Sequence, residues 1–574
     1  MMKSLIHRGP DGQGFFFDDT NGVAFGHNRL SIIDLTEGGH QPMMSEDKQV
    51  VLVYNGEIYN FKELRKELEG LGHRFRSQCD TEVVLQSFIQ WGEDCVNRFC
   101  GMFAFAIWSV KDKKLFLARD PMGMKPLYYA CLPNNQGFVF ASEIKVFLAL
   151  PDFTPRLNSS SLQQFIEFGY IYDVNETSLE GIFKLPPGHI LEVFNGYPNK
   201  PTPFFMPRMP DYPNSHSLEE FQSKLHSSLT EVVFQHLVAD VPVGLLLSGG
   251  LDSSVIAAIA ARQQKIRTIN MSFSESNIDE RFYARLVSKH IGSDHHEVII
   301  NSDDLINDLE KVFWYVDDLF TDFGLISTRL LYKKCREMGI KVVIVGEGSD
   351  ELFSGYSNIR YFERDKAHFP NVWKLFQLYR RYAGRRYGKQ FIKFYVMMND
   401  YLRQSKGDML LAIRLFQSKN QLPNNYVMKV DKASMSVSVE ARAPYLDRRI
   451  AELVYQIPNR FLFAENTNKW ILRSMTDRYK LLPKEIIDRP KYGASMAMSW
   501  MDDSRNFREY SRKEILRKNS MVDKLGLRKA MEDYFDNGKV GYPFPHSISL
   551  FRNLAWRLLL LNLWSQKYLR LGGA

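Results

Sequence analysis

The stretch LLLSGGLDSS, residues 245–254, decides the fold of the second half of this 574-residue chain. The apolar residues before it predict a buried strand, and the run VIAAIAA after it predicts a helix. Between them, Gly249 and Gly250 let the backbone approach a ligand closely, and Ser248, Ser253 and Ser254 add hydroxyl donors. The first turn of the helix points backbone N–H groups and a positive dipole at the same place. This arrangement suits pyrophosphate.

Acidic residues in two stretches predict a magnesium site beside this loop. Asp252 has the wrong sign for holding phosphate directly, so its natural partner is Mg²⁺. The stretch IVGEGSDELFSGY, residues 344–356, follows another apolar strand and carries three carboxylates, at Glu347, Asp350 and Glu351. In isolation it is an acidic turn. Paired with Asp252 it supplies a second Mg²⁺ ligand, Asp350.

The sequence around these stretches alternates strand-like and helix-like segments. They are IRTINMSF (266–273), DERFYARLVSKHIG (279–292), HHEVII (295–300), RLLYKKCREMG (329–339) and IKVVIVGEG (340–348). Such alternation predicts a doubly wound parallel sheet. Beyond residue 360 the pattern is mostly helical, and the basic run around Arg385 is interpreted as a solvated helix or loop. The apolar run at 554–564 is too short to span a membrane and predicts a buried helix.

The first half of the chain has a different texture. Residues 22–150 carry six strand-length apolar runs at hairpin spacing, with two amphipathic helical segments between them. This mixture predicts a layered α+β domain. A proline-rich stretch follows, so we expect a first domain over 1–195, a linker over 196–215 and a second domain over 216–574.

Composition excludes several classes of protein. Apolar residues make up 45% and charged residues 24%, which is the balance of a globular protein and not of a disordered one. A net charge of +8 is a mild excess and does not favour a nucleic-acid partner. The five cysteines form no CxxC pair, so we expect buried, reduced thiols and no zinc ribbon or disulfide framework. The N-terminus has no secretory signal, and we expect a cytoplasmic protein without a membrane partner.

The loop at 245–254 closely resembles the SGGxDS pyrophosphate loop of the N-type ATP pyrophosphatases. With the stretches at 344–356, KVDKASMSVSVEARAPYLD (429–447) and LPKEIIDRPKYGASMAMSW (482–500), it resembles the synthetase domain of glutamine-dependent asparagine synthetases. The resemblance implies that Lys491 meets the phosphates and that Glu347 positions or deprotonates ammonia. Asp252 and Asp350 would hold Mg²⁺. The implied ATP and pyrophosphate contacts are Leu247, Ser248, Gly249, Gly250, Asp252, Ser253, Ser254, Ser272 and Gly346.

The first half resembles the class II glutamine amidotransferase domain. The resemblance rests on HRGPDGQG, HNRLSIIDL, YNGEIYNF, CDTEVVL, GMFAFAIW, RDPMGMKPLYY and ASEIK. It implies that glutamine is held by Arg29, Asn55, Gly56, Glu57 and Asp80. Arg29 and Asp80 carry the right charges for the α-carboxylate and α-ammonium of an amino acid. Asn55 and a glycine N–H are suited to an oxyanion hole.

In that family the chain starts with a cysteine, whose own α-amino group activates its thiol to attack glutamine. Here the HRGPD loop begins at His7 and residue 2 is Met2, so residues 1–574 provide no glutaminase nucleophile. Cys79 has no free amine and does not replace it. We expect a longer native product with an upstream Met-Cys start. The alternative is a short form whose synthetase half uses free ammonia.

The implied reaction is ATP-dependent amidation of a carboxylate through an acyl-adenylate, with ATP and Mg²⁺ bound and AMP and pyrophosphate released. Aspartate is the expected acceptor and glutamine the family's nitrogen donor. Two segments, 277–300 and 317–335, look like a broad bacterial branch that amidates other carboxylates, such as sugar acids or cell-surface precursors. A non-catalytic scaffold is the alternative from another class. The implied partners are small molecules, with a possible second copy of the chain.

Overall fold

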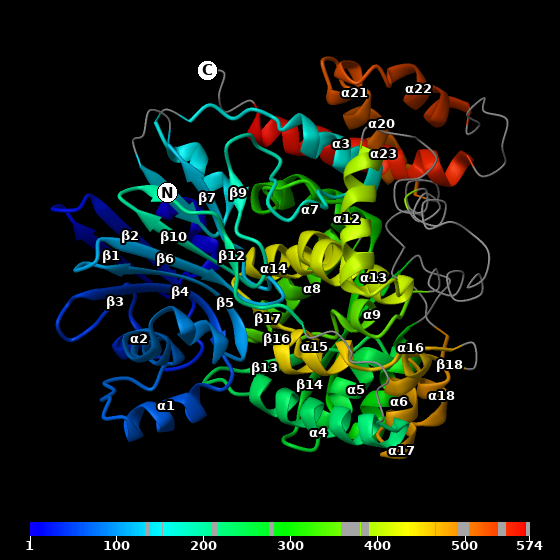
Figure 1. Cartoon of the computed structure of the whole chain (residues 1–574). Coiled ribbons are helices and arrows are strands. Elements are labelled where there is room, and N and C mark those ends of the chain that lie inside the picture. Colours follow the sequence, from blue (N-terminus) through cyan, green and yellow to red (C-terminus); the bar gives the residue numbers. More distant parts are fainter. Residues whose placement is uncertain are drawn as a thin grey trace.

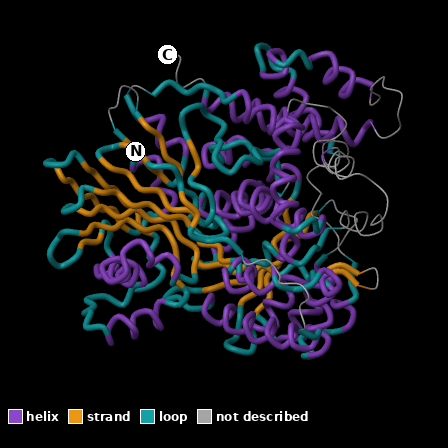
Figure 2. Tube along the Cα trace, viewed as in Figure 1, coloured by secondary structure: helices purple, strands orange, loops and turns teal. Residues whose placement is uncertain are grey.

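The computed structural model describes residues 1–132, 137–151, 153–207, 216–274, 280–322, 324–356, 379, 390–464, 467–490, 504–537 and 547–569. Two sequence predictions, the phosphate-binding Lys491 and the basic run around Arg385, lie outside these residues. One group of strands lies in the part of the molecule that holds the N-terminus, and a second group lies among the helices of the rest (Figure 2).

A seven-stranded sheet forms the centre of the first half, and its neighbouring strands run antiparallel. Its strands are β3 (Met43–Met44), β4 (Val50–Ile58), β5 (Gly101–Ser109), β6 (Lys114–Arg119), β10 (His189–Phe194), β11 (Tyr197–Pro198) and β12 (Thr202–Pro203). Helices α1 (Phe61–Gly70) and α2 (Asp80–Trp91) lie along this sheet (Figure 1). Leu64, Val84 and Phe105 belong to the apolar core that they share with it.

Other strands pack on the sheet with a second apolar core. The antiparallel pair β1 (Gly12–Asp18) and β2 (Val23–Arg29) contributes Phe25, which packs with Val53 and Trp108 of the main sheet. A three-stranded sheet consists of β7 (Tyr128–Cys131), β8 (Phe138–Ala141) and β9 (Phe183–Lys184). Helix α3 (Ser159–Phe168) lies between β8 and β9 in the sequence. The predicted layered α+β architecture is confirmed.

The expected linker begins later than its proline content suggested. Residues 197–198 and 202–203 pair with β10 and extend the main sheet. Proline lacks a backbone donor and is tolerated at a sheet edge, so Pro198 and Pro203 fit these short edge strands. The division of the chain into two domains stays a prediction, with this part of the stretch belonging to the first sheet.

The second half is built on a five-stranded sheet whose strands all run parallel. They are β13 (Val243–Leu246), β14 (Arg267–Phe273), β15 (Asp294–Ile300), β16 (Val342–Ile344) and β17 (Glu440–Arg442). The connecting helices are α4 (Leu218–His236), α5 (Leu251–Ala260), α6 (Arg281–Ile291), α7 (Ser302–Tyr315) and α8 (Leu325–Glu337). This is the predicted doubly wound sheet.

The strand order β15-β14-β13-β16-β17 fixes where a ligand can bind. From β13 the chain first adds β14 and β15 on one side and then returns to add β16 and β17 on the other. The loops that follow β13 and β16 therefore begin at neighbouring strand ends, at the point where the strand order reverses and a doubly wound sheet forms its crevice. Ligands of doubly wound sheets bind in such a crevice, beyond the carboxyl ends of the strands.

Helices complete the second half. They are α9 (Ser349–Leu352), α12 (Gln390–Gln404), α13 (Met409–Phe416), a π-helical turn (Gln417–Tyr426), α14 (Val427–Met435), α15 (Arg448–Tyr455), α16 (Asn459–Leu462), α17 (Trp470–Arg478), α18 (Lys484–Ile487), α20 (Arg505–Ile515), α21 (Met521–Lys524), α22 (Arg528–Asn537) and α23 (Ser547–Tyr568). The predicted helical carboxyl-terminal part is confirmed.

The apolar run at 554–564 lies in α23 and is buried, as predicted. Its interrupting charge has a function in packing, because Arg557 Nη1 donates hydrogen bonds to the carbonyl oxygens of Ile166 and Glu167 in α3. The last helix is thus bonded to the first half of the chain. Over the described residues, every helix is too short or too polar to cross a membrane.

Candidate functional site

The loop after β13 is organised by its own serines. Ser248 Oγ and Ser253 Oγ lie 3.1 Å apart, and the backbone N–H of Gly250 donates to Ser248 Oγ at 3.3 Å. Leu247 is tied to β14, since its N–H donates to Ile269 O at 2.8 Å. The loop is therefore held in one shape at the crevice, in the place that the sequence predicted for pyrophosphate.

Gly249 shows why this loop needs glycine. Its φ is +69°, and a Cβ built there would lie 2.5 Å from the backbone nitrogen of Ala284 and 2.6 Å from the carbonyl carbon of Tyr283. A side chain would strain the backbone and collide with α6 at the same time. Gly250 has no such constraint, because its φ is −79° and it caps the helix α5.

Two further serines of the predicted set lie beneath the loop. Ser254 is fully buried, and Ser272 in β14 is 7% exposed. The hydroxyl oxygen of each has no hydrogen-bond partner among the described residues. Buried hydroxyls are usually satisfied, so two orphans at one crevice mark a place where a ligand or water supplies the missing partner.

The loop after β16 approaches the first loop closely. A Cβ built on Gly346 would lie 3.1 Å from the backbone nitrogen of Ser253. Ser349 Oγ donates to Asp252 Oδ1 at 2.8 Å, and Tyr445 OH donates to Asp252 O at 3.1 Å. The structure thus brings together the two motifs that the sequence placed a hundred residues apart.

Lys469 lies between the two predicted metal-binding carboxylates. Its Nζ is 2.6 Å from Asp252 Oδ2 and 2.7 Å from Asp350 Oδ1, and it donates to Ser349 Oγ at 3.3 Å. The carboxylates raise the pKa of Lys469, so its ammonium stays charged. The sequence analysis missed this residue. Lys469 directly precedes α17 and has a φ of +56°. No local sequence pattern distinguishes it from other lysines.

The chemistry of this pair of carboxylates fits a magnesium ion. The two face one cation already, which shows that they are arranged to share positive charge. No group of three or more His, Cys, Asp or Glu side chains suited to a metal occurs in the described ranges. Mg²⁺ is ordinarily held by one or two carboxylates together with substrate phosphates and water, so two carboxylates beside a phosphate loop are sufficient.

Glu347, the predicted ammonia-positioning residue, has a defined partner. Its Oε1 lies 3.1 Å from Lys429 Nζ, which also lies 3.7 Å from Asp322 Oδ2. The Glu347 side chain is 32% exposed, whereas that of Lys429 is 11% exposed. The Glu347 carboxylate is therefore partly exposed at the loop after β16, while the more buried Lys429 of α14 is paired with it.

The structure describes the chain up to the residue before Lys491. Arg489, two residues before it, stacks over the Tyr283 ring at 4.0 Å and lies 3.1 Å from Glu280. Its Nη1 is 3.4 Å from Ser248 O, at the phosphate loop. The segment that leads to Lys491 thus touches the first loop at its base, and the role of Lys491 itself stays a prediction.

A cavity of about 130 Å³ lies mostly in the first half, with Met435 and Glu440 of the second half also in its lining, and it includes every predicted glutamine contact. Arg29, Asn55, Gly56, Glu57 and Asp80 all line it. The amide nitrogen of Asn55 is buried, with no hydrogen-bond partner in the described part of the chain. A free donor in a polar cavity matches the expected oxyanion contact.

Asp80 begins α2 and points back at the sheet. Its Oδ2 accepts from Tyr54 OH at 2.6 Å and from the backbone N–H of Ile58 at 3.0 Å. Burial dominates these hydrogen bonds and raises the pKa of Asp80 to about 6. The carboxylate is thus ionised at neutral pH but close to protonation.

Two of the predicted contacts are engaged by the protein itself. The Arg29 guanidinium donates to the carbonyl oxygens of Thr36 and Asp34, on the loop that follows β2. The Glu57 carboxylate accepts from Arg442 Nη2 at 2.7 Å, across the boundary between the two halves. Sequence reasoning missed Arg442 because 385 residues separate the two side chains.

Cys79 is unsuited to attack glutamine. It is 2% exposed, and burial raises the pKa of its thiol to about 11. All five cysteines are free, as expected, but Cys131 is exposed and Cys100 is half-buried. The expectation that every thiol is buried was wrong for these two, since Cys131 ends the short strand β7 at the surface.

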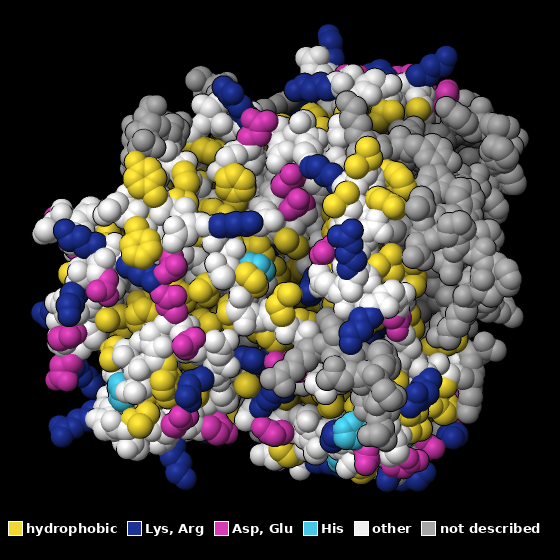
Figure 3. All heavy atoms as spheres, in the orientation of Figure 1, with side chains coloured by type: hydrophobic (Ala, Val, Ile, Leu, Met, Phe, Trp, Pro, Cys, Tyr) yellow, Lys and Arg dark blue, Asp and Glu magenta, His cyan; other side chains and the backbone are white. Residues whose placement is uncertain are grey.

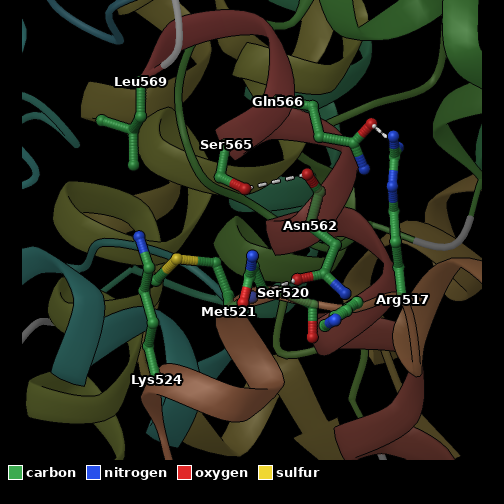
Figure 4. A pocket seen from close by; sticks show the side chains of 10 residues that line it. Arg517, Ser520, Met521, Lys524, Asn562, Ser565, Gln566 and Leu569 are labelled. Atoms are coloured by element: carbon green, nitrogen blue, oxygen red, sulfur yellow. Dashed lines mark hydrogen bonds between the residues drawn. The ribbon is translucent and has the colours of Figure 1, made fainter. Parts of the chain in front are cut away.

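Another cavity, of about 100 Å³, lies among α20, α21 and α23 (Figure 4). Its side chains bond to one another: Arg517 donates to Gln566 at 2.7 Å, and Asn562 accepts from the backbone N–H of Met521 at 2.9 Å. None of the residues that the sequence singled out lines it. Acidic and basic side chains are interspersed on the face in Figure 3, without a single-sign stripe that would suit nucleic acid.

Comparisons with known proteins agree with this geometry. A family model described as a glutamine amidotransferase domain matches residues 1–204, and one described as asparagine synthase matches residues 224–566. The chain is 32% identical over 520 residues to glutamine-hydrolyzing asparagine synthetase 3 of Bacillus subtilis (strain 168), covering 86% of this chain and 82% of that protein.

Two other relatives have the same description. Asparagine synthetase 1 of Bacillus subtilis (strain 168) is 29% identical over 548 residues, with 88% of this chain and 85% of that protein covered. The enzyme of Zea mays is 29% identical over 533 residues, with 89% and 76% covered. The matches span both halves of the chain and both sites. We conclude that the chain belongs to the asparagine synthase family and is an ATP-dependent ligase, with a glutamine amidotransferase domain in front of its synthase domain.

Proposed function

We propose that the chain converts aspartate to asparagine, using ATP and Mg²⁺, with nitrogen from glutamine or from free ammonia. The observation that carries this proposal is the meeting of Asp252, Asp350 and Lys469 at the crevice between the loops after β13 and β16. A phosphate loop beside shared carboxylates and a buried ammonium suits transfer of an adenylyl group and departure of pyrophosphate.

The first step forms an acyl-adenylate. An oxygen of the acceptor carboxylate attacks the α-phosphorus of ATP, and the bond between that phosphorus and the bridging oxygen breaks to release pyrophosphate. Ser248, Ser253 and the backbone N–H of Gly250 hydrogen-bond the departing phosphates at the start of α5. Lys469 neutralises the charge that develops on them. Mg²⁺, held by Asp252 and Asp350, would neutralise the β- and γ-phosphate oxygens.

The second step forms the amide. Ammonia attacks the activated carbonyl carbon, loses a proton and expels AMP. Glu347 is partly exposed at the loop after β16 and is the carboxylate placed to orient the ammonia and accept that proton. Lys429 holds Glu347 in position through the contact of 3.1 Å between Nζ and Oε1.

The cavity that lies mostly in the first half is assigned to glutamine. Asp80 and Glu57 supply negative charge for the α-ammonium group, Arg29 faces the α-carboxylate, and Asn55 donates to the side-chain carbonyl oxygen. We place the enzyme in the cytoplasm, where ATP and both amino acids are available.

The first experiment measures pyrophosphate release from Mg·ATP by this chain in ammonium chloride, with and without aspartate. Aspartate-dependent release with equimolar asparagine supports the assignment. Release that requires another carboxylate moves the enzyme to that substrate. Unchanged ATP with every acceptor, from a chain with a cooperative thermal transition, overturns a catalytic role.

Glutamine replaces ammonium chloride in a second set of reactions. Asparagine formed with ammonium and not with glutamine assigns free ammonia as the nitrogen source of residues 1–574. Asparagine formed with glutamine, accompanied by equimolar glutamate, shows that this chain hydrolyses glutamine and overturns the expectation that it carries no nucleophile.

A further inference from the structure

Arg442 is a buried arginine of the second half that donates to the second half and, through one nitrogen, to the first. It is 0% exposed. Its Nη2 donates to Glu57 Oε2 at 2.7 Å, its Nε donates to Glu440 Oε1 at 2.9 Å, and its Nη1 donates to His236 O at 2.9 Å and to Val238 O at 2.7 Å. A guanidinium is suited to this task because its planar fork binds several acceptors in fixed directions.

The backbone of the same residue supports the other site. Arg442 ends β17, which pairs with β16, and its carbonyl oxygen accepts from the N–H of Val345 at 2.9 Å. Val345 is followed directly by Gly346 and Glu347 of the crevice. One residue therefore fixes a glutamate of the glutamine cavity with its side chain and the base of the crevice loop with its main chain.

We propose that Arg442, contributed by the synthase half, is a positioning residue for the glutamine pocket, and that this pocket is incomplete without it. The inference deepens the proposed function, because it rests on the assignment of the cavity to glutamine. Arg442 acts through Glu57, whose carboxylate it orients and whose negative charge it stabilises.

The charges around Glu57 explain why it needs this partner. Burial and the negative charges of Asp80 and Glu440 raise the pKa of Glu57, whereas Arg442 and Lys125 lower it. Lys125 Nζ is committed to Glu440 Oε2 at 3.2 Å, so Arg442 is the cation bonded to Glu57. Without the guanidinium, a buried carboxylate takes up a proton and stops attracting an ammonium group.

Arg448 provides a matched control. It also belongs to the second half and crosses to the first, where its Nη1 donates to Asn97 O at 2.9 Å. Asn97 does not line the glutamine cavity. A defect caused only by loosening the contact between the halves would therefore appear in both arginine variants. A defect in positioning Glu57 would appear only in the variants of Arg442.

The test compares the full chain with R442Q, R442K and R448Q. Glutamine binding is measured by isothermal titration calorimetry, and ammonium-dependent pyrophosphate release is measured separately. We expect R442Q to weaken glutamine binding at least ~10-fold at neutral pH, since removing one partner of a buried charge pair is costly. R442K keeps the charge without the fork and is expected to fall between R442Q and the unchanged chain.

The pH profile separates positioning from mere packing. Glutamine affinity is measured between pH ~6.5 and ~8.5, and that of R442Q is expected to recover as the pH rises, because loss of the guanidinium raises the pKa of Glu57 and its ionisation then requires a higher pH. The unchanged chain and R448Q, in which Arg442 still lowers the pKa of Glu57, should show a smaller recovery. If R442Q does not fold, the R442K and R448Q comparison carries the test.

Three results would overturn the inference. The first is an equal glutamine affinity for R442K and the unchanged chain. The second is an equal loss of glutamine affinity in R442Q and R448Q. The third is an absence of glutamine binding by the unchanged chain. The arginine variants at 442 keep the backbone bond to Val345. Their ammonium-dependent pyrophosphate release therefore reports on the proposed function independently of these results.

Discussion

The two sites differ in how their carboxylates are exposed and paired. In the crevice, the side chains of Asp252 and Asp350 are 25% and 22% exposed and share the ammonium of Lys469. In the glutamine cavity, Glu57 and Asp80 are at most 5% exposed, and burial raises the pKa of both. The first arrangement leaves its charges partly exposed and paired with one shared cation, and it suits a polyphosphate with its cation. The buried carboxylates of the glutamine cavity keep their charges only with a specific partner and at a sufficiently high pH.

The largest effect tests the shared charges of the crevice. Asp252→Asn removes the carboxylate that Lys469 and Ser349 both contact. We expect pyrophosphate release to fall by about 100-fold or more, as for other losses of transition-state electrostatics. The measurement is the initial rate of release in ammonium chloride with the acceptor present. Asp477→Asn, at an exposed carboxylate beside Lys480, is the matched control and should leave the rate unchanged. Equal rates for both variants would contradict the role of Asp252.

The next effect tests the rigidity of the phosphate loop. Gly249→Ala puts a methyl group in the left-handed region and against the backbone of Ala284. We expect it to cost about 3 kcal/mol or more of stability, combining backbone strain with overpacking, together with most of the activity. Gly22→Ala has a similar φ, +65°, and open space around the new methyl, so only ~1–2 kcal/mol is expected. Urea titrations followed by tryptophan fluorescence compare the two. If Gly249→Ala lowers stability no more than Gly22→Ala does, the phosphate loop is able to adjust to a side chain and is not rigid.

A smaller effect tests the titration of the buried site. Asp80 has a pKa of about 6, so above that pH it offers a carboxylate to an ammonium group and below it a neutral acid. Glutamine affinity should therefore fall as the pH drops through 6, by ~10-fold for each further pH unit. Calorimetric titrations at a series of pH values measure this, with ADP binding in the crevice as the comparison that should change less. Asp80→Asn should bind weakly and without the pH dependence. A profile that is identical in that variant would remove Asp80 from the explanation.

The smallest effect tests whether the difference between the sites is local. Ser217 caps α4, where its side chain accepts from the Glu220 N–H at 3.2 Å and the Glu220 carboxylate accepts from the Ser217 N–H at 3.1 Å. Ser217→Ala should cost ~1 kcal/mol of stability. Thermal unfolding measures the loss, and both ligand affinities should stay unchanged. A shift in either affinity would mean that the sites depend on the global stability of the chain.

Local patterns predicted most of the fold. The strand, glycine turn and helix at 243–260 lie where the periodicity placed them, because each is determined by neighbours a few residues away. Asn55 and Glu57, by contrast, were identified through the resemblance of YNGEIYNF to the class II glutamine amidotransferase domain, and the structure places both on β4. The meeting of Asp252 with the loop after β16 followed from two similar motifs and from the order that a doubly wound sheet imposes.

Long-range partners could not be predicted in this way. Lys469 reaches Asp252 over 217 positions, and Arg442 reaches Glu57 over 385. Both bonds depend on how separate elements pack, and lysines and arginines of the same appearance occur throughout the surface. The sheet pairing of residues 197–203 was missed because proline content argued for a linker, while two short edge strands require few backbone donors.

The bond between Arg557 and α3 has a consequence for biosynthesis. The carbonyl oxygens of Ile166 and Glu167 receive these donors from a helix 390 or so positions later. The early part of the chain therefore emerges from the ribosome long before Arg557, which provides this contact, has been synthesised. Until α23 has been synthesised, the carbonyl oxygens of Ile166 and Glu167 at the end of α3 lack these donors.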